Sequence, residues 1–147
     1  VEEFIDGREF SVSLIGNKRP IVLPVAEIDF STMPANMPKV FSYRAKWIKQ
    51  SIAYKATPLI CPAQIDEKTT KTIEEAARKC YKIFACRGYV RVDFRYDEKE
   101  NKLYVLELNP NPDLAADCNI AKSAEAAGMS YHDLILKLIE FALERRD

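Results

Sequence analysis

Two stretches of alternating apolar and polar residues, joined by a short polar run, constrain this chain more than any other feature. Residues 89–96 and 103–109 alternate, and residues 97–102 between them are all polar or charged. Alternation of this kind is typical of strands that bury one face, so the segment predicts an antiparallel hairpin. With a turn centred near Glu100, Asp93 lies opposite Glu107, and Arg91 lies opposite Asn109. The other face then carries the residues expected in the core, Val92, Phe94, Leu106 and Leu108.

Further strands are expected before this hairpin. Residues 1–5 and 9–15 are separated by Asp6-Gly7, a turn signal, and predict a second hairpin. Residues 9–15 alternate, so we expect a half-buried strand with Glu9, Ser11 and Ser13 on its polar face. Residues 21–28 predict a third strand, which Pro24 interrupts. Residues 29–51 are expected to be irregular, and their basic end could face an anion.

Three helices complete the expected fold. One spans residues 66–86, with Asp66 as its N-cap and Gly88 at its end, and the others span residues 120–127 and the segment after Ser130. The expected buried positions are Ile73, Ala76, Ala77, Cys80 and Phe84 in the first helix, and Leu134, Ile135, Leu138, Ile139 and Ala142 in the last, which closes with Arg145-Arg146. These elements predict an α+β fold, a largely antiparallel sheet flanked by helices.

Composition excludes several classes of protein. The chain has 147 residues, with 22 Lys and Arg against 22 Asp and Glu, so its formal net charge is zero. Its length fits one domain with a sizeable core. A duplex-binding protein needs a basic excess, and a membrane span needs about 20 successive apolar residues, neither of which is present. We therefore expect neither a nucleic-acid partner nor a membrane partner.

The cysteines and the first residues indicate the protein's setting. Cys61, Cys80, Cys86 and Cys118 form no CxxC pair, and the single His132 is far from them in sequence, so a zinc site is not expected. We expect reduced thiols in a cytoplasmic protein. The chain starts at Val1 in what is expected to be a strand, without a signal peptide, so we expect it to be a piece of a longer protein.

The facing carboxylates of the hairpin need a compensating charge, because Asp93 and Glu107 repel each other. Mg²⁺ prefers oxygen ligands and is held by one or two carboxylates together with nucleotide phosphates. Asn109 adds a carbonyl oxygen, and Arg91 adds a positive charge suited to a developing oxyanion. Two alternatives stay open here. Asp93 and Glu107 could form ion pairs with Arg91, Arg95 or Lys102 on a solvated face, or they could be the paired carboxylates of a hydrolase.

The residues of this hairpin resemble the ATP-grasp superfamily, most closely its D-alanine–D-alanine ligase branch. The similar segments are Arg91-Val92-Asp93 and Leu106-Glu107-Leu108-Asn109-Pro110-Asn111-Pro112. The resemblance implies that Asp93, Glu107 and Asn109 hold two Mg²⁺ ions, or Mn²⁺, that bridge the phosphates of ATP. It also implies a catalytic role for Arg91, in contact with the reacting phosphoryl or carbonyl oxygens.

Other segments extend the resemblance over nearly the whole chain. Residues 1–10 resemble the hinge strand of the family, which implies that Glu2, Phe4 and Ile5 line the adenine and that Glu9 meets the ribose hydroxyls. Leu106 joins this nucleotide-binding set. Residues 43–47 resemble a mobile loop whose lysine reaches the phosphates, which implies that catalytic role for Lys46. Residues 126–130 and the following helix resemble the family's C-terminus.

The implied protein is an ATP-dependent carboxylate–amine ligase that acts through an acylphosphate and takes a small carboxylate and a small amine. Residues 1–147 would be its C-terminal, larger ATP-grasp subdomain. The chain has no Gly-rich phosphate loop, so we expect the N-terminal domains of the same protein to supply it and the chain alone to be inactive. Asp113 stands where the family has a glycine, so we expect an acceptor other than D-alanine. A non-catalytic nucleotide-binding or interaction module with this fold is the alternative that Asp113 favours.

Overall fold

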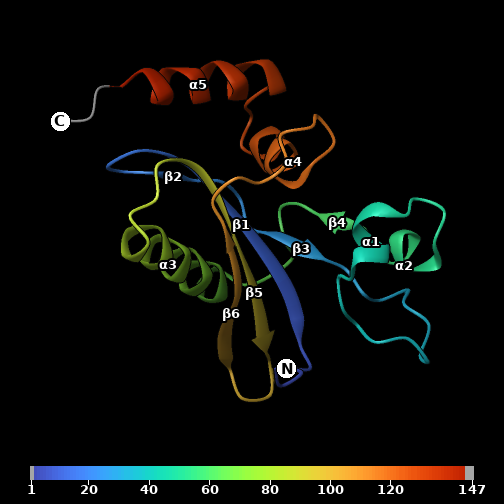
Figure 1. Ribbon diagram of the computed structural model, residues 1–147. Coiled ribbons are helices and arrows are strands. Elements are labelled where there is room, and N and C mark those ends of the chain that lie inside the picture. Colours follow the sequence, from blue (N-terminus) through green and yellow to red (C-terminus); the bar gives the residue numbers. More distant parts are fainter. Residues whose placement is uncertain (1, 145–147) are drawn as a thin grey trace.

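The computed structural model describes residues 2–144, which form one antiparallel sheet with helices on both of its faces (Figure 1). The elements are β1 (Arg8–Gly16), β2 (Ile21–Val22), β3 (Ala26–Ile28), α1 (Tyr43–Trp47), α2 (Ile52–Lys55), β4 (Leu59–Ile60), α3 (Glu67–Ile83), β5 (Gly88–Asp97), β6 (Lys102–Asn109), α4 (Asn119–Ala126) and α5 (Tyr131–Leu143). The strand order is β4-β3-β1-β5-β6, and β2 pairs with β1 beside this path. The expected α+β fold with a largely antiparallel sheet is confirmed.

Strand β1 is the centre of the sheet and is buried on both faces. It pairs with β2 and β3 along one edge and with β5 along the other. Its polar residues Glu9, Ser11 and Ser13 are only 7%, 4% and 1% exposed. The prediction of a half-buried strand was therefore wrong, because alternation reports two chemically different faces and does not report what covers the polar one.

Helix α3 covers the apolar face of the sheet. Phe10, Val12 and Leu14 of β1 share a core with Val90, Val92 and Phe94 of β5 and with Ile73, Ala77, Cys80 and Tyr81 of α3. The register places Phe10 opposite Phe94 and Leu14 opposite Val90, so these side chains project from the same face. We expected Phe84 to be buried, but it is 64% exposed, because it lies just after the last residue of α3, Ile83. Tyr81 of α3 is buried in this core instead.

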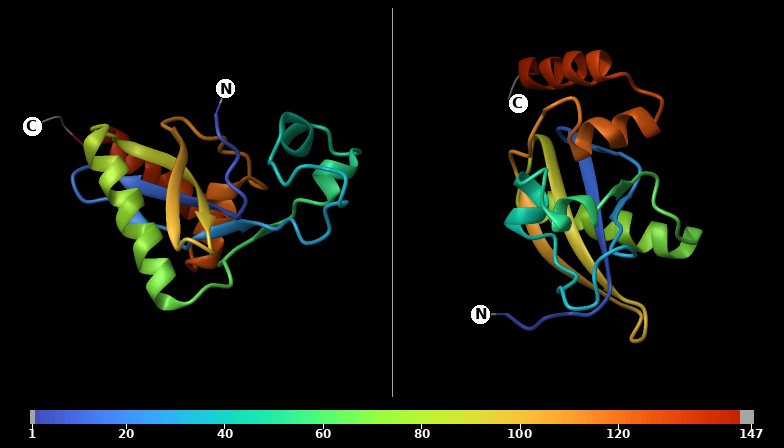
Figure 2. Two further views of the ribbon diagram at one scale, coloured as in Figure 1. Left: turned by 90° about the horizontal axis from the view of Figure 1, so that it is seen from below. Right: turned by 90° about the vertical axis from the view of Figure 1, so that its right-hand side faces the viewer.

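Helices α4 and α5 pack against the other face, at the end of the strands where β1 finishes. Ile15 of β1 and Leu23 share a second core with Ile120, Ala121 and Ala124 of α4 and with Leu134 and Leu138 of α5. The right-hand view of Figure 2 shows both helices at the end of the sheet opposite the β5–β6 turn. These two helices cover only the part of the polar face around Ile15.

Several element boundaries differ from those expected. Residues 2–6 form no strand, so the first expected hairpin is absent; Val1 lies outside the described residues, as do Arg145 and Arg146. The expected strand over 21–28 is two short strands on either side of Pro24, and residues 29–51 contain the short helix α1. In α5, Ile139 is 51% exposed and Ala142 is also exposed, because only one stripe of the helix contacts the core.

The β5–β6 hairpin has the predicted register at its functional end. Arg91 pairs with Asn109 and Asp93 with Glu107, as expected. A bulge follows, because the next pair joins Phe94 to Val105 and leaves Leu106 without a partner. From there to the turn the register is one residue off the one predicted from a turn at Glu100. Leu106 is 47% exposed, so the prediction that it lies in the core was wrong.

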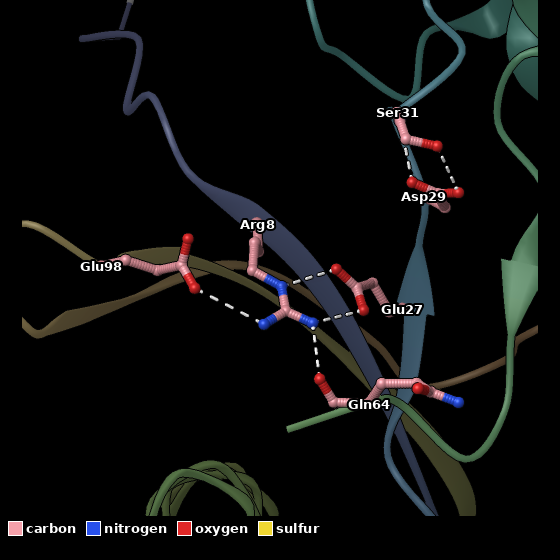
Figure 3. Close-up of polar contacts among 6 residues, drawn as sticks. All are labelled: Arg8, Glu27, Asp29, Ser31, Gln64 and Glu98. Carbon is pink, nitrogen blue, oxygen red and sulfur yellow. Dashed lines mark hydrogen bonds and ion pairs between the residues drawn. The ribbon is translucent and has the colours of Figure 1, made fainter. Parts of the chain in front are cut away.

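Arg8 ties four segments together at the start of β1 (Figure 3). Its Nε and Nη2 atoms each donate to a carboxylate oxygen of Glu27 at 2.7 Å. It also donates to the backbone oxygen of Gln64 at 3.0 Å and to Glu98 in the β5–β6 turn at 3.4 Å. The guanidinium of Arg8 also lies over the ring of Phe10, on the face of the sheet that α3 covers. These contacts fix the first residues of β1 from that face.

Within residues 2–144, no helix combines the length and the apolar character needed to cross a membrane.

The N-cap of α3 gives a first prediction. Asp66 accepts from the backbone N–H of Thr69 at 2.9 Å, and its hydrogen bonds with Thr69 hold the pKa of Asp66 below its ordinary value. We expect Asp66→Ala to lower the melting temperature by about 3 °C at pH 7. The difference should shrink as the pH falls through the lowered pKa, because protonation removes the charge of Asp66 and leaves only a neutral acceptor for the cap.

Asp66→Asn is the matched control, since asparagine also caps helices. It should lose much less stability than the alanine variant at pH 7. A melting-temperature difference for Asp66→Ala that stays constant down to pH 2 would contradict this account of the cap.

Candidate functional site

The candidate site lies on the polar face of the sheet, between two segments that cover its ends. At one end α4 and α5 pack over Ile15. At the other end the loop after β3 approaches Glu9, because Arg95 beside Glu9 donates to the backbone oxygen of Lys39. The polar residues between these covers come from three adjacent strands: Glu9, Ser11 and Ser13 of β1, Arg91, Asp93 and Arg95 of β5, and Glu107 and Asn109 of β6.

Arg91 and Asp93 form a two-point ion pair at the centre of this face. Arg91 Nε lies 2.8 Å from Asp93 Oδ1, and Arg91 Nη2 lies 2.8 Å from Asp93 Oδ2. Burial alone would lower the pKa of Arg91, but the hydrogen bonds and charge of Asp93, together with the charge of Glu107, raise it above its ordinary value. One of the ion pairs that the sequence left open is therefore present, and it neutralises one of the two facing carboxylates.

Glu107 and Asn109 complete the central group from β6. Glu107 is exposed and faces Asp93 across the strands, and its charge reaches Arg91. Asn109 faces Arg91, and its side-chain oxygen accepts from the backbone N–H of Asn111 at 3.0 Å. Two carboxylates and an amide oxygen on neighbouring strands form a hard oxygen donor set, which suits Mg²⁺ or Mn²⁺. Within residues 2–144, no cluster of three or more His, Cys, Asp or Glu side chains is placed to hold a metal ion, so a metal here would depend on the amide.

Glu9 and Arg95 form a second ion pair further along the same face. Arg95 Nη2 lies 3.1 Å from Glu9 Oε2, and the two side chains are 5% and 9% exposed. Burial raises the pKa of Glu9 above its ordinary value, and the charges of Arg95 and Lys46 oppose that rise. Burial lowers the pKa of Arg95 in turn. The ion pair is needed because an isolated charge at this depth would be costly.

Lys46 reaches this end of the site from α1. Its ammonium nitrogen lies 5.4 Å from the centre of the Phe41 ring, and its charge acts on Glu9. Ser42 is the N-cap of α1, and its hydroxyl accepts from the backbone N–H of Ala45. This cap fixes the start of the helix that carries Lys46. The structure thus places Lys46 near Glu9, a proximity that the sequence alone could not indicate.

The segment before β1 supplies the remaining expected nucleotide residues. Glu2 and Phe4 are exposed and Ile5 is half-buried, and the guanidinium of Arg95 lies 5.7 Å from the centre of the Phe4 ring. Leu106 is exposed because of the bulge in β6, which frees it from the core. Phe4 and Leu106 are therefore accessible to a ligand, and Phe4 contacts the second ion pair through Arg95.

Sequence reasoning missed the pairing of Arg95 with Glu9 and the burial of Ser11 and Ser13. Arg95 appeared only as one of several bases that could pair with the carboxylates. The hydroxyl oxygens of Ser11 and Ser13 are buried without a hydrogen-bond partner, on the same face as Asp93 and Arg91. An arginine directly opposite Glu9 in the register is the signal that could have identified the second ion pair, but that register requires pairing strands that are far apart in sequence.

Comparison with known proteins identifies the family. The family model described as the D-ala D-ala ligase C-terminus matches residues 1–140. The D-alanine–D-alanine ligase of Carboxydothermus hydrogenoformans is 40% identical over 146 residues, which are 99% of this chain and 43% of that protein. The corresponding ligase of Pelotomaculum thermopropionicum is 37% identical over 144 residues, which are 98% of this chain and 42% of that protein.

Solved structures agree with this. A D-alanine–D-alanine ligase from Bacillus anthracis complexed with ATP matches with a TM-score of 0.70 and 25% identity, over 97% of this chain and 39% of that one. The VanG D-Ala:D-Ser ligase from Enterococcus faecalis matches with a TM-score of 0.75 and 26% identity, over 96% of this chain and 38% of that one. The chain belongs to the family of D-alanine–D-alanine ligase C-terminal domains, with the ATP-grasp fold, and spans about two fifths of the length of the relatives it matches.

Gly7, at the entrance to the site, gives a second prediction. A Cβ atom on Gly7 would lie 2.1 Å from the backbone oxygen of Tyr96, so only glycine lets the chain enter β1 beside β5. We expect Gly7→Ala to lower the free energy of unfolding by about 2 kcal/mol in urea denaturation, because backbone atoms must move apart.

Gly128→Asn is the control for this substitution. Gly128 has a φ of +80° with nothing within 4 Å of an added Cβ, and asparagine tolerates positive φ. A loss for Gly7→Ala no larger than the loss for Gly128→Asn would show that the close approach to Tyr96 is not a constraint.

Proposed function

We propose that this chain is the magnesium- and ATP-binding part of an ATP-dependent ligase that joins a carboxylate to an amine. One observation carries the proposal: the β5–β6 register places Asp93 opposite Glu107 and Arg91 opposite Asn109, in a member of this ligase family. The B. anthracis relative, solved in complex with ATP, supports the choice of nucleotide. The proposal includes that residues 1–147 form the C-terminal, larger ATP-grasp subdomain of a longer protein.

The proposed metal ligands are Asp93, Glu107 and Asn109. They would hold two Mg²⁺ ions, or Mn²⁺, whose positive charge would neutralise the phosphates of ATP. Arg91 already holds Asp93 through two nitrogen atoms, so binding a cation at Asp93 requires the guanidinium to give up at least part of this pair. The released nitrogen atoms of Arg91 would then be free to donate to ligand oxygens beside the metal.

The proposed adenosine site is built from the residues around the Glu9–Arg95 pair. Glu2, Phe4, Ile5 and Leu106 would contact the adenine, and Glu9 would accept hydrogen bonds from the ribose hydroxyls. The exposure of Phe4 and Leu106 supports a stacking role, because large apolar side chains gain free energy when a flat ring covers them. The charge of Lys46 near Glu9 supports an additional role in binding the phosphates, further along the nucleotide.

In the proposed reaction, the carboxylate substrate attacks the terminal phosphorus of ATP, and ADP leaves. The amine then attacks the resulting acylphosphate, an amide forms, and phosphate leaves. Arg91 and Lys46 would stabilise the negative charge that develops on the transferring group, so the protein mainly supplies positioning and electrostatics. Asp113 is exposed and accepts from the backbone N–H of Ala115 at 3.0 Å, and its carboxylate supports an acceptor other than D-alanine.

The rest of the parent protein, with its N-terminal domains, is proposed to cover the site and to complete the clamp on the phosphates. Tyr43, Trp47 and Ile52 of the α1–α2 region are 72%, 63% and 63% exposed, and a cluster of large apolar side chains supports a covering partner. The cytoplasmic location stays part of the proposal, supported by the four cysteines, which are all free.

Metal-dependent nucleotide binding is the third prediction. Mg-ATP at about ten times its dissociation constant should raise the melting temperature of this chain by about 4 °C, because ligand binding stabilises the folded state. Asp93→Asn and Glu107→Gln should each reduce this rise to less than about 1 °C, since each removes a metal-binding charge.

Glu67→Gln is the matched control, because Glu67 is an exposed carboxylate paired with Lys71 on α3, away from the site. It should keep the full effect of Mg-ATP. A rise in melting temperature that survives both Asp93→Asn and Glu107→Gln would refute the metal site.

The incomplete clamp gives the fourth prediction. The isolated 147-residue chain should release no ADP above background from ATP with a small carboxylate and an amine, whereas the longer gene product should do so. The reason is that in this proposal the phosphates need groups from the N-terminal domains. Steady turnover by the isolated chain, followed by a coupled ADP assay, would show that the described residues suffice.

A further inference from the structure

Arg95 is the most deeply buried cation among residues 2–144. It is 4% exposed, and the other buried polar residues of the described chain are acids, serines and a threonine. Burying a guanidinium is costly, so its surroundings must satisfy most of its hydrogen-bond donors. None of the proposed catalytic steps uses this side chain, so its contacts need a separate explanation.

The guanidinium of Arg95 joins β5 to two segments that are far from it in sequence, residues 7–9 and the loop after β3. Its Nη1 atom donates to the backbone oxygen of Gly7 at 3.0 Å, and its Nη2 atom donates to the backbone oxygen of Lys39 at 2.9 Å. Nη2 also lies 3.1 Å from Glu9 Oε2. One planar group thus fixes the segment before β1, the loop after β3 and the carboxylate of Glu9.

Aromatic rings complete the surroundings of this guanidinium. Its central carbon lies 5.7 Å from the centre of the Phe4 ring and 5.4 Å from the centre of the Phe30 ring. Phe4 belongs to the segment before β1, and Phe30 belongs to the loop after β3. The ring contacts therefore join the same two segments as the backbone hydrogen bonds.

Glu9 keeps acceptor capacity in spite of this ion pair. The Oε2 atom of Glu9 is buried and has no hydrogen bond in the described structure, so its contact with Arg95 is a charge pair without a well-aligned N–H bond. This carboxylate oxygen is held in place and lacks a donor, but it is closed to solvent, so a ligand hydroxyl would reach it only after the groups that cover it move apart.

We propose that Arg95 is a positioning residue of the nucleotide site, which holds Glu9, the segment of Phe4 to Gly7 and the Lys39 loop in the arrangement in which Glu9 accepts the ribose hydroxyls. Arg95 then sets the preference for ribonucleotides over nucleotides without these hydroxyls. This inference rests on the proposed ATP site, but it assigns to β5 a role beyond metal binding.

The test compares ATP with 2′,3′-dideoxy-ATP, which lacks both hydroxyls, by isothermal titration calorimetry with Mg²⁺ on the gene product that contains this chain. The unmodified protein should prefer ATP by about tenfold, because hydrogen bonds to a charged acceptor are lost in the analogue. Arg95→Lys keeps the charge but lacks the planar fork, and it should reduce the preference to about twofold. Glu9→Gln should reduce the preference in the same way.

Arg8→Lys is the matched control. Arg8 also holds a carboxylate of the sheet, Glu27, with two nitrogen atoms, but from the side that α3 covers (Figure 3). It should keep the tenfold preference whatever its effect on stability. Arg95→Gln keeps Glu9 and offers an amide donor in place of the guanidinium, so it provides a second test if Arg95→Lys does not fold. It should also reduce the preference to about twofold.

The outcomes separate this inference from the proposed function. ATP binding with the full preference retained in Arg95→Lys, or in Arg95→Gln, overturns the role of Arg95 and leaves the proposed function standing. An unmodified protein that binds ATP and the dideoxy analogue equally also overturns that role. An unmodified protein that binds neither overturns both proposals.

Discussion

The structure depends on the neutralisation of charge on the covered polar face of its sheet. Strand β1 lies in the middle of the sheet, so its face opposite α3 carries Glu9 into the interior, and β5 adds Asp93 one strand away. A buried charge without a partner is costly. Arg95 compensates Glu9, and Arg91 compensates Asp93, so both of these acids have an arginine beside them from β5. In the same arrangement Glu107 faces Asp93, and the amide of Asn109 faces Arg91. The oxygen atoms of this group could bind a divalent metal, and the guanidinium could bind a phosphate.

These two pairs divide the face into regions of different character. Around Arg91 and Asp93, the strand register brings together oxygen ligands and a guanidinium, which suits a metal and the reacting phosphate. Around Arg95 and Glu9, backbone contacts and aromatic rings hold a carboxylate that still has acceptor capacity, which suits a sugar. Lys46 from α1 adds positive charge to the second region. The order of these groups along the sheet matches the order of groups along a nucleotide, and this match links the fold to the proposed function.

Much of this could be predicted from the sequence, and the exceptions have physical causes. The pairing of Asp93 with Glu107 and of Arg91 with Asn109 was predicted from alternation and a turn centred at Glu100, but it holds only because a bulge shifts the register by one residue. Nearer the turn, Phe94 pairs with Val105 instead of Leu106. The bulge that exposes Leu106 could not be predicted, because it adds a single unpaired residue to β6 and the sequence of that strand carries no signal for its position. The burial of Ser11 and Ser13 depends on segments distant in sequence that cover β1. The role of Arg95 depends on a pairing of β1 with β5 across more than 70 residues, together with a loop whose position no local signal determines.

The central claim is that Asp93, Glu107 and Asn109 bind a divalent cation beneath the phosphates of a nucleotide. A crystal structure of the gene product with Mn²⁺ and a non-hydrolysable ATP analogue tests this most directly, because Mn²⁺ can be located by its anomalous scattering. The account predicts Mn²⁺ within about 2.3 Å of oxygen atoms of all three residues, with the two-point pair between Arg91 and Asp93 at least partly opened. An ion bound elsewhere, with that pair intact and the nucleotide distant from β5 and β6, would contradict the account.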